Sequence, residues 1–464
     1  MQWENLYSHK RTGKENKSNN DSQIIEDQIV RSGYQRDYDR LIFSSPFRRL
    51  QNKTQVFPIP GSIFVHNRLT HSLEVASVGR SIANIIGQKI IQQYKKEKKT
   101  ITEEFERFYT VELSAVISSA CLAHDIGNPP FGHSGEKAIS KYFFSGKGKN
   151  YKNDLSDTQW NDLINFEGNA NAFRILTHHF NGRSSGGYSL TYTTLASMLK
   201  YPCSSIGVLK GENVSRKKYG FFDSETETFK KIVTEFDLPK TSEKSYCRHP
   251  FVFLVEAADD ISYRVIDWED AYRLGIFTPQ EAEDLLIRFF EEDKDKKELE
   301  SLKRGLGYIS DKGERIAFLR AKTINLLITE CINIFWKNHE LILEGKYEKS
   351  LIDEIPGKIQ EALKYLGKKS VDKIYNHRSV IEIELAGYTV LGGLLEEFIP
   401  AVLENNSHYD AKLIQLIPDQ FLSTTDNVYS KIQSVTDFIS GMTDLYAVEM
   451  YRKIKGISFP GLMS

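Results

Sequence analysis

Apolar residues recur at helical spacing in five long stretches of the chain. A helix that packs on a core places an apolar residue every three or four positions, and each stretch follows this rule. The stretches cover residues 73–90, Val111 to Leu122, Phe251 to Ile266, Ile316 to Trp336, and Ile381 to Leu403. The chain contains no internal repeat of roughly 20 to 50 residues. The pattern predicts a mostly α-helical protein.

Alternation of apolar and polar residues, which is typical of strands, is scarce. Its best examples are the short stretches Gln55-Val56-Phe57 and Lys218 to Phe222. Two polar segments, Ser145 to Thr158 and Ser204 to Arg216, indicate loops. The expected fold class is therefore all-α, with very little β-structure.

The same pattern indicates three regions along the chain. Residues 1–33 are mostly polar and predict a flexible N-terminal arm. Residues 34–275 predict a folded core, and residues 276–464 predict a C-terminal helical region packed on it. No linker rich in Pro, Gly or Ser separates these two regions, so one continuous domain is an alternative.

Composition excludes several classes of protein. The 61 Lys and Arg residues balance 62 Asp and Glu residues, and the net charge of −1 gives no whole-protein attraction to nucleic acid. The four cysteines lack a CxxC pair and indicate neither a disulfide framework nor a thiolate zinc site. The first residues lack a secretion leader, and the best apolar run, Leu385 to Leu395, is too short to span a membrane. We expect a soluble, cytoplasmic protein without membrane contact.

The sequence His-Asp-Ile-Gly-Asn-Pro-Pro-Phe-Gly-His at residues 124–133 carries the first candidate chemistry. Its first glycine and its two prolines cannot continue the helix predicted over Val111 to Leu122, so that helix ends here. The helix end can aim both His124 and Asp125 outward. An imidazole nitrogen and a carboxylate oxygen are ligands for a divalent ion, and two more such ligands are needed elsewhere.

Two other helices offer the missing ligands. His71 lies at the start of one apolar stretch, and Asp259 interrupts another. Asp259, Tyr263 and Asp267 are four residues apart, so on a helix they share one face. That face can present one carboxylate to a metal and two polar groups to a ligand beyond it.

Each of these residues alone has an ordinary structural reading. A lone histidine is commonly a core-edge residue, and a lone carboxylate is commonly solvated. Their combination on three helices, with His133 and Glu136 just downstream, indicates a divalent-metal site instead.

Longer strings around these residues resemble a known family. The order of a histidine, a His-Asp pair and a later aspartate is similar to that of the HD-domain phosphohydrolase superfamily. Within it, seven strings resemble the deoxyguanosinetriphosphate triphosphohydrolase (dGTPase) family. They are Phe47 to Gln51, Arg68 to Val75, His124 to Glu136, Phe166 to Ala170, Leu199 to Pro202, Glu256 to Tyr263, and Gly441 to Asp444. The resemblance covers about residue 34 to Tyr446 and implies an HD-domain catalytic core with additional C-terminal helices.

The resemblance implies a role for each candidate residue. The implied metal ligands are His71, His124, Asp125 and Asp259. The implied catalytic dyad, which orients or deprotonates the attacking water, is His133 with Glu136. The implied substrate-binding residues are Gln55, Val56, Arg68, Lys200, Tyr201, Lys218, Tyr263, Asp267 and Glu384.

The substrate-binding residues divide by the part of a nucleotide that each would meet. Arg68 would face the phosphates, and Lys200, Tyr201 and Lys218 would assist it. Asp267 would accept the 3′-hydroxyl, while the ring of Tyr263 would fill the space that a 2′-hydroxyl needs. The implied sugar and base contacts are Gln55, Val56 and Glu384.

The implied reaction is hydrolysis of dGTP, or of another dNTP, to a deoxynucleoside and inorganic triphosphate. It would use one divalent ion per site, with Mg²⁺ or Mn²⁺ favoured and Fe²⁺, Zn²⁺ or Ni²⁺ as alternatives. The family further implies a homo-oligomer, expected to be a hexamer, and a nucleotide or single-stranded DNA as effector.

Two other functions remain open at this point. The same ligands suit hydrolysis of a different phosphoester, such as a cyclic nucleotide or an alarmone. A nucleotide-sensing or single-stranded-DNA-binding module with a structural metal is the non-enzymatic alternative. The spacing of Tyr263 and Asp267 argues against the first, and the presence of His133 and Glu136 argues against the second.

Overall fold

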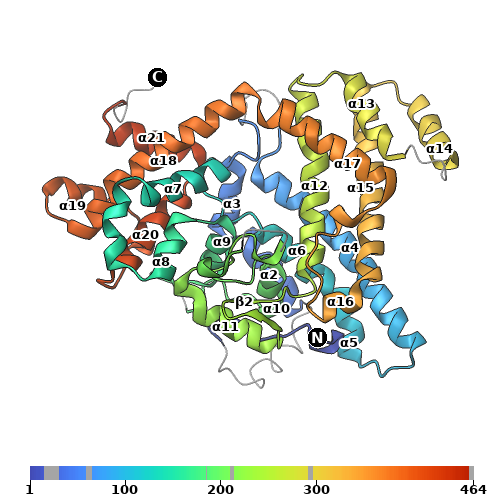
Figure 1. Ribbon diagram of the computed structural model, residues 1–464, viewed down its shortest axis with the longest axis horizontal. Coiled ribbons are helices and arrows are strands. Elements are labelled where there is room, and N and C mark those ends of the chain that lie inside the picture. Colours follow the sequence, from blue (N-terminus) through green and yellow to red (C-terminus); the bar gives the residue numbers. More distant parts are fainter. Residues whose placement is uncertain (15–30, 59–64, 184, 210–213, 291–295, 459–464) are drawn as a thin grey trace.

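A computed structural model describes residues 1–14, 31–58, 65–183, 185–209, 214–290 and 296–458. Helices make up nearly all the regular structure of these residues, which confirms the predicted all-α fold class (Figure 1). Two short strands, β1 (Lys240–Ser242) and β2 (Ser245–Tyr246), pair in an antiparallel hairpin.

The α-helices are α2 (Gly33–Ile42), α3 (Ser45–Arg49), α4 (Arg68–Lys96), α5 (Glu103–Arg107), α6 (Leu113–Ala123), α7 (His133–Phe144), α8 (Asp157–Ile164), α9 (Gly168–Thr177), α10 (Tyr192–Met198), α11 (Thr226–Glu235), α12 (Val252–Arg273), α13 (Pro279–Ile287), α14 (Lys296–Gly307), α15 (Lys312–Lys337), α16 (His339–Leu343), α17 (Gly357–Lys369), α18 (Arg378–Glu404), α19 (His408–Ile414), α20 (Val428–Ser440) and α21 (Asp444–Ile454). Two π-helical turns are η3 (Phe108–Glu112) and η10 (Ser370–Tyr375). The 3-10 turns are η1 (Trp3–Asn5), η2 (Leu50–Asn52), η4 (Lys147–Asp154), η5 (Ser205–Gly207), η6 (Val214–Arg216), η7 (Asp223–Glu225), η8 (Arg288–Phe290), η9 (Ile352–Glu354) and η11 (Asp419–Phe421).

All five apolar stretches fall within helices, and the local sequence sets where these begin. Helix α4, for example, begins at Arg68 because the side chain of Asn67 accepts a hydrogen bond from the N–H of Thr70. The hydroxyl of Thr70 in turn accepts from the N–H of Asn67, which completes a capping box. The cap places His71 in the first turn of α4.

The strand-like stretches predicted from alternation are not strands. Residues 55–57 and 218–222 are irregular, although Tyr219, Phe221 and Phe222 are buried. Their apolar side chains pack in the two hydrophobic clusters, and no strand among the described residues pairs with them in a ladder of hydrogen bonds. The segment Ser145 to Thr158, predicted as a loop, contains the 3-10 turn η4.

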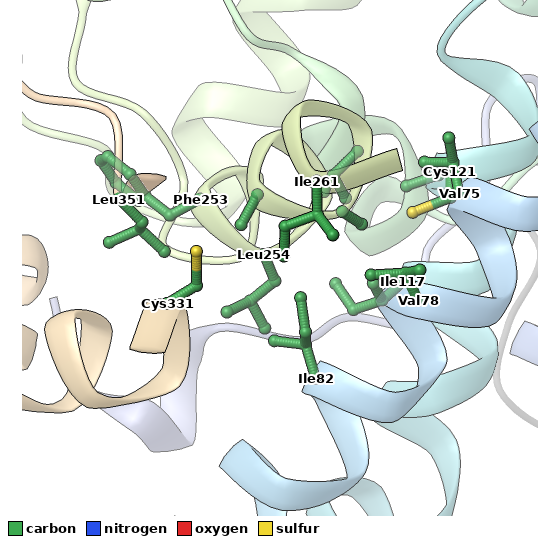
Figure 2. Close-up of a cluster of buried hydrophobic side chains, with 14 of the residues drawn as sticks. Val75, Val78, Ile82, Ile117, Cys121, Phe253, Leu254, Ile261, Cys331 and Leu351 are labelled. Atoms are coloured by element: carbon green, nitrogen blue, oxygen red, sulfur yellow. The ribbon is translucent and has the colours of Figure 1, made fainter. Parts of the chain in front are cut away.

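The largest hydrophobic cluster lies between α4, α6, α12 and α15. Figure 2 shows side chains from these helices meeting in its interior. The labelled residues are Val75, Val78, Ile82, Ile117, Cys121, Phe253, Leu254, Ile261, Cys331 and Leu351. Full burial of one such aliphatic side chain contributes roughly 1.5 to 3 kcal/mol. The cluster therefore holds α4, α6 and α12 in fixed relative positions.

A second hydrophobic cluster joins α7 and α8 to α18, α20 and α21. Helix α18 packs along α7 and α20 (Figure 1). The residues beyond 275 are thus shared between two clusters, because those up to Val380 belong to the first cluster and those from Val390 to the second. The border expected at residues 275 and 276 falls in the turn that follows α12.

Helix α18 is long and apolar enough to cross a membrane by length and composition alone. It contacts α7, α19, α20 and α21, and about 44% of its most apolar window is buried inside the protein. Two carboxylates within it form ion pairs, Glu396 with Lys147 and Glu397 with Lys455. The apolar helix is thus longer than the run Leu385 to Leu395 that the sequence indicated as too short to span a membrane.

The first fourteen residues do not form the predicted flexible arm. Trp3 and Leu6 are buried in the first cluster, with 4% and 0% of their surfaces exposed. The guanidinium of Arg11 donates to the carboxylate of Asp37 at 2.6 Å. The segment is mostly polar, so its composition did not indicate that Trp3 and Leu6 are buried or that Arg11 pairs with Asp37. Residues 15–30 of the predicted arm lie outside the described residues.

Replacement of Trp3 by alanine tests the docking of this segment. The indole contacts the rings of Tyr109 and Phe335, and loss of a buried aromatic side chain costs about 3 kcal/mol or more. We expect Trp3→Ala to lower the free energy of unfolding by about this amount in urea titrations. The exposed neighbour Gln2 provides the control, since Gln2→Ala should leave stability unchanged. Equal stability of both variants would contradict the docking.

Candidate metal centre and nucleotide site

Three helices bring His71, His124 and Asp259 together. The Nε2 atom of His71 lies 3.2 Å from Oδ1 of Asp259, and Nε2 of His124 lies 3.5 Å from the same oxygen. The candidate ligand atoms of the three residues all lie within 4.8 Å of one another. His71 comes from the first turn of α4, His124 directly follows α6, and Asp259 comes from α12. These residues are far apart in the sequence. They come together because their three helices pack in the first hydrophobic cluster.

Second contacts fix how the histidine rings face. The Nδ1 atom of His124 lies 2.6 Å from the carbonyl oxygen of Cys121, so Nδ1 carries the proton and donates. Its Nε2 atom lies on the side of Asp259. The rings of His71 and His124 meet edge to face, with centroids 5.3 Å apart. A backbone carbonyl that orients an imidazole in this way is common beside metal ions.

The surroundings hold Asp259 in its charged form. Burial acts to raise the pKa of its carboxyl group, but His124, His71 and Lys200 together hold that pKa well below its usual range. A carboxylate ready to bind a cation therefore sits between two imidazoles.

Asp125 lies beside this group and is tied to other side chains. Its Oδ2 accepts a hydrogen bond of 2.7 Å from Arg68, and its Oδ1 accepts one from the side-chain amide of Asn128. Oδ1 lies 3.7 Å from Nε2 of His124. Burial acts to raise the pKa of Asp125, yet Arg68 and the imidazoles of His124 and His71 lower it to about 2.

The donor set and its spacing fit a divalent metal ion. Nitrogen and oxygen ligands bind such ions at about 2.1 Å, which places two ligands of one ion roughly 3 to 4 Å apart. The measured separations of 3.2, 3.5 and 3.7 Å fall in this range. Two imidazoles with two carboxylates suit Mg²⁺, Mn²⁺, Fe²⁺, Zn²⁺ or Ni²⁺.

Arg68 is buried beside the metal ligands, with 5% of its surface exposed. Its Nε atom is also buried and has no hydrogen-bond partner among the described residues. Gly132 makes room for the guanidinium, since a Cβ at this position would collide with it. Gly132 also adopts a φ of +57°, a conformation that side chains disfavour. The unpartnered Nε is the kind of donor that a bound anion satisfies.

His133 and Glu136 form a hydrogen-bonded pair at the start of α7. The Nδ1 atom of His133 donates to Oε2 of Glu136 at 2.8 Å, and Oε1 accepts from the N–H of Gly168 at 2.7 Å. The side chain of His133 is 71% exposed, whereas that of Glu136 is 9% exposed. The carboxylate of Glu136 thus holds the largely exposed ring of His133 in one orientation.

The charge of Lys218 acts on this pair. Its ammonium lies 2.9 Å from the carboxylate of Glu167, the residue that caps α9. Burial acts to raise the pKa of Glu136, but the hydrogen bond from His133 and the charge of Lys218 lower it below its usual value. Lys218 therefore lies near the His133–Glu136 pair, where it forms an ion pair with Glu167.

Lys200 and Tyr201 are closely enclosed. The ammonium of Lys200 lies 3.3 Å from Glu256, whose carboxylate also accepts from Arg248 at 2.8 Å. Tyr201 is 7% exposed. Burial acts to lower the pKa of Lys200, yet Glu256, Tyr201, Asp260 and Asp259 raise it well above its usual value. Lys200 is thus a charged lysine close enough to lower the pKa of the candidate ligand Asp259.

Tyr263 and Asp267 follow Asp259 at one-turn intervals along α12, as their spacing predicted. Asp267 is buried, and its Oδ2 accepts a hydrogen bond of 2.8 Å from the hydroxyl of Tyr375. Burial raises the pKa of Asp267 to about 7, despite this hydrogen bond. Burial is the main cause that raises the pKa of Tyr375. Its interactions with Asp267 and Tyr263 raise this pKa further.

The last three candidates differ in their surroundings. Gln55 has a buried Oε1 atom without a hydrogen-bond partner among the described residues, and Val56 packs against the first cluster. Glu384 is exposed on α18, and within the described part of the chain its carboxylate has no hydrogen bond or ion pair. The structure does not join Glu384 to the other candidates.

Sequence reasoning missed three residues of this region. Tyr375 comes from η10 in the C-terminal region, Asn128 binds Asp125, and Lys53 donates to the carbonyl oxygen of Asn128 at 2.5 Å. Burial lowers the pKa of Lys53 to about 7, although the charge of Asp444 acts to raise it. Asn128 lies inside the string at residues 124–133, so its position was a usable signal. Nothing in the local sequence marks the other two.

Comparisons with known proteins agree with this geometry. The chain matches the HD domain over residues 68–182 and the phosphohydrolase-associated domain over residues 354–453. A deoxyguanosinetriphosphate triphosphohydrolase-like protein of Synechocystis is 36% identical, over 99% of this chain and all of the relative. One of Pseudomonas aeruginosa is 35% identical over the same shares. A deoxyguanosinetriphosphate triphosphohydrolase of Yersinia enterocolitica is 30% identical, over 91% of this chain and 93% of the relative.

A helical core that presents His, His-Asp and Asp from three helices defines an HD-domain phosphohydrolase. The full-length similarity narrows this class further. The chain belongs to the deoxyguanosinetriphosphate triphosphohydrolase (dGTPase) family.

Proposed function

We propose that this protein is a metal-dependent triphosphohydrolase of deoxynucleoside triphosphates, with dGTP as the leading substrate. The observation that carries the proposal is the grouping of His71, His124 and Asp259, with the His133–Glu136 pair at the start of a neighbouring helix. Membership of the dGTPase family supports the same substrate class.

The metal ligands of this proposal are His71, His124, Asp125 and Asp259. A divalent ion at this position supplies Lewis-acid polarisation of the α-phosphoryl oxygens. Arg68 supports binding of the negatively charged phosphates, since its buried Nε atom, beside Asp125, has no hydrogen-bond partner in the described part of the chain. A triphosphate carries about four negative charges, so a chain of net charge −1 must gather cations locally.

His133 is the proposed general base and acid. Its Nε2 atom takes a proton from water as the water oxygen bonds to the α-phosphorus. The bond from that phosphorus to the 5′-oxygen breaks, and the protonated His133 gives its proton to the 5′-oxygen. The deoxynucleoside and inorganic triphosphate leave, and His133 returns to its neutral form. Glu136 stabilises the positively charged ring through their hydrogen bond.

The sugar side of the proposed site lies one and two turns further along α12. Asp267 accepts the 3′-hydroxyl, and the ring of Tyr263 occupies the space beside C2′. Tyr375 holds the Asp267 carboxylate through its hydroxyl. Gln55 and Val56 are proposed contacts to the sugar and base, where the buried Oε1 of Gln55 offers an acceptor. Lys200 and Tyr201 support the phosphate side, and Glu384 remains the weakest base contact.

The wider setting follows the family. We propose a cytoplasmic homo-oligomer, with a hexamer as the expected form and a nucleotide or single-stranded DNA as effector. Mg²⁺ or Mn²⁺ is the proposed native ion, since cellular supply rather than affinity commonly decides among such ions.

Product analysis tests the proposal directly. Purified protein is incubated with dGTP and Mn²⁺ or Mg²⁺, and the products are separated by anion-exchange chromatography. We expect deoxyguanosine and inorganic triphosphate in equal amounts, and no reaction after chelation of the metal. Formation of dGMP and pyrophosphate would place the cleavage at another bond and contradict the proposal. Binding of dGTP without turnover would favour the nucleotide-sensing alternative.

Sugar selectivity provides a sharper prediction. An added 2′-hydroxyl buried against Tyr263 without a partner costs about 1 to 3 kcal/mol, which corresponds to a preference of roughly five- to 150-fold. We expect kcat/KM for dGTP to exceed that for GTP by this factor, and Tyr263→Ala to narrow the ratio. Tyr272→Ala, on the same helix, is the control and should leave the ratio unchanged. Equal wild-type values for dGTP and GTP would reopen the alternative of another phosphoester.

A further inference from the structure

The side chain of Asp444, the first residue of α21, accepts hydrogen bonds from two distant backbone segments. Its Oδ2 accepts from the N–H of Thr54 at 2.8 Å, and its Oδ1 accepts from the N–H of Phe131 at 3.0 Å. One carboxylate in the C-terminal region therefore connects two loops of the catalytic core. Both loops lead directly to residues of the proposed site.

The first loop carries His133. Phe131 and Gly132 have φ values of +63° and +57°, so two consecutive residues adopt the left-handed region just before α7 begins. Phe131 has a side chain, and side chains disfavour this conformation. A charged acceptor on its N–H stabilises the turn in the one conformation that directs His133 into place.

The second loop carries Gln55 and Val56. Thr54 forms an isolated backbone bridge with Asn67, the residue that caps α4 and so sets the position of Arg68 and His71. The hydrogen bond from Thr54 to Asp444 fixes this loop from its other side. The carboxylate of Asp444 thus connects the segment that begins at Gln55 with the turn that precedes His133. It thereby fixes the distance between these two parts of the proposed site.

Neighbouring contacts join the same pieces. The ammonium of Lys53 donates to the carbonyl oxygens of Asn128 and Ser440, at 2.5 and 2.8 Å. Arg49 donates to the carbonyl oxygen of Gly441 at 3.1 Å. We call residues 440–444 the C-terminal clasp. Its acceptors receive donors from residues 49, 53, 54 and 131.

A simple helix-capping role does not account for Asp444. The side chain of Thr443 already caps α21 by accepting from the N–H of Tyr446. An acidic residue in the first turn favours any helix slightly, but both carboxylate oxygens of Asp444 are directed to other loops.

We propose that Asp444 is a positioning residue of the catalytic site, which sets the placement of His133 and of the segment that begins at Gln55. The inference rests on the proposed function, since its effect is measured as turnover. Among the described residues, Asp444 forms no hydrogen bond or ion pair with a proposed metal ligand, and its role is to hold the turn at Phe131 and Gly132.

Asp444→Asn is the first variant. An asparagine side chain offers one oxygen acceptor, and its amide nitrogen repels the second N–H. We expect kcat for dGTP to fall about ten- to hundredfold, as displacement of a reacting group by a fraction of an ångström produces. Metal content should remain at the wild-type level because no ligand is changed. Glu449→Gln, an exposed carboxylate on the same helix, is the matched control and should leave kcat unchanged.

A double-mutant cycle separates positioning from general destabilisation. If Asp444 acts by placing His133, then Asp444→Asn should lower kcat by twofold or less in a His133→Ala background. Full multiplication of the two effects, or a wild-type kcat in Asp444→Asn, would overturn the inference. Should Asp444→Asn fail to fold, Asp444→Glu enters the same cycle, since it keeps the charge but displaces both oxygens. Wild-type protein without any triphosphate release would instead refute the proposed function.

Discussion

Asp259→Asn is expected to remove the bound divalent ion and to lower triphosphate release by at least about a thousandfold. The carboxylate of Asp259 faces both His71 and His124, so its charge is the element that unites the candidate ligands. A metal that polarises a phosphoryl group contributes several kcal/mol to transition-state stabilisation, and each 1.4 kcal/mol corresponds to about a tenfold change in rate. Elemental analysis of the purified variant and a triphosphate assay measure the two effects separately.

The neighbouring carboxylate supplies the control for this prediction. Asp260 accepts a hydrogen bond from Ser350 at 3.0 Å and is no member of the ligand group. Asp260→Asn should therefore retain its metal. Asp259→Asn that still holds one ion per chain would show that the ion binds elsewhere. Asp125→Ala completes the series, and we expect loss of both metal and activity from it as well, since its Oδ1 lies beside His124.

His133→Ala is expected to lower kcat by about two to four orders of magnitude, the range for loss of a general acid or base. Metal content and KM should change little, because His133 is not in the ligand group and its ring is largely exposed. The measurement is kcat and KM for dGTP at saturating Mn²⁺. His408→Ala, an exposed histidine on α19, is the control.

Two outcomes are informative for His133→Ala. Turnover within a few-fold of wild type would mean that the ring is structural and that water is activated without it. Loss of both metal and turnover would mean that His133 contributes to metal binding, a role that its hydrogen bond with Glu136 does not indicate. Glu136→Gln should give a smaller loss than His133→Ala, because it weakens the orientation of the ring but keeps the ring itself.

The five long helices were predictable because their signals are local. Apolar spacing marked α4, α6, α12, α15 and α18, and the glycine and prolines after His124 marked the end of α6. The four-residue spacing of Asp259, Tyr263 and Asp267 required only helical periodicity. These signals depend on residues close in sequence.

The remainder depends on contacts between distant residues, which a single sequence does not encode in readable form. Lys200 and Lys218 were predicted as phosphate contacts, a role that stays a prediction, and their pairing with Glu256 and Glu167 follows from packing alone. Tyr375 meets Asp267 across more than a hundred residues. The N-terminal segment was misassigned because its polar average outweighed Trp3 and Leu6.

The packing of α18 against α7 bears on how this protein can vary over evolution. Leu391 approaches Gly135 so closely that a Cβ on the glycine would press against it, and Gly387 lies in the same way against the ring of Phe131. These glycines allow two helices, one from each matched domain, to share an apolar interface next to the turn that carries His133. A bulkier residue at Gly135 or Gly387 would therefore need a smaller residue at the position that it contacts on the opposite side of the interface. We therefore expect that exchanging either domain alone between relatives would bring mismatched surfaces together beside the turn that carries His133.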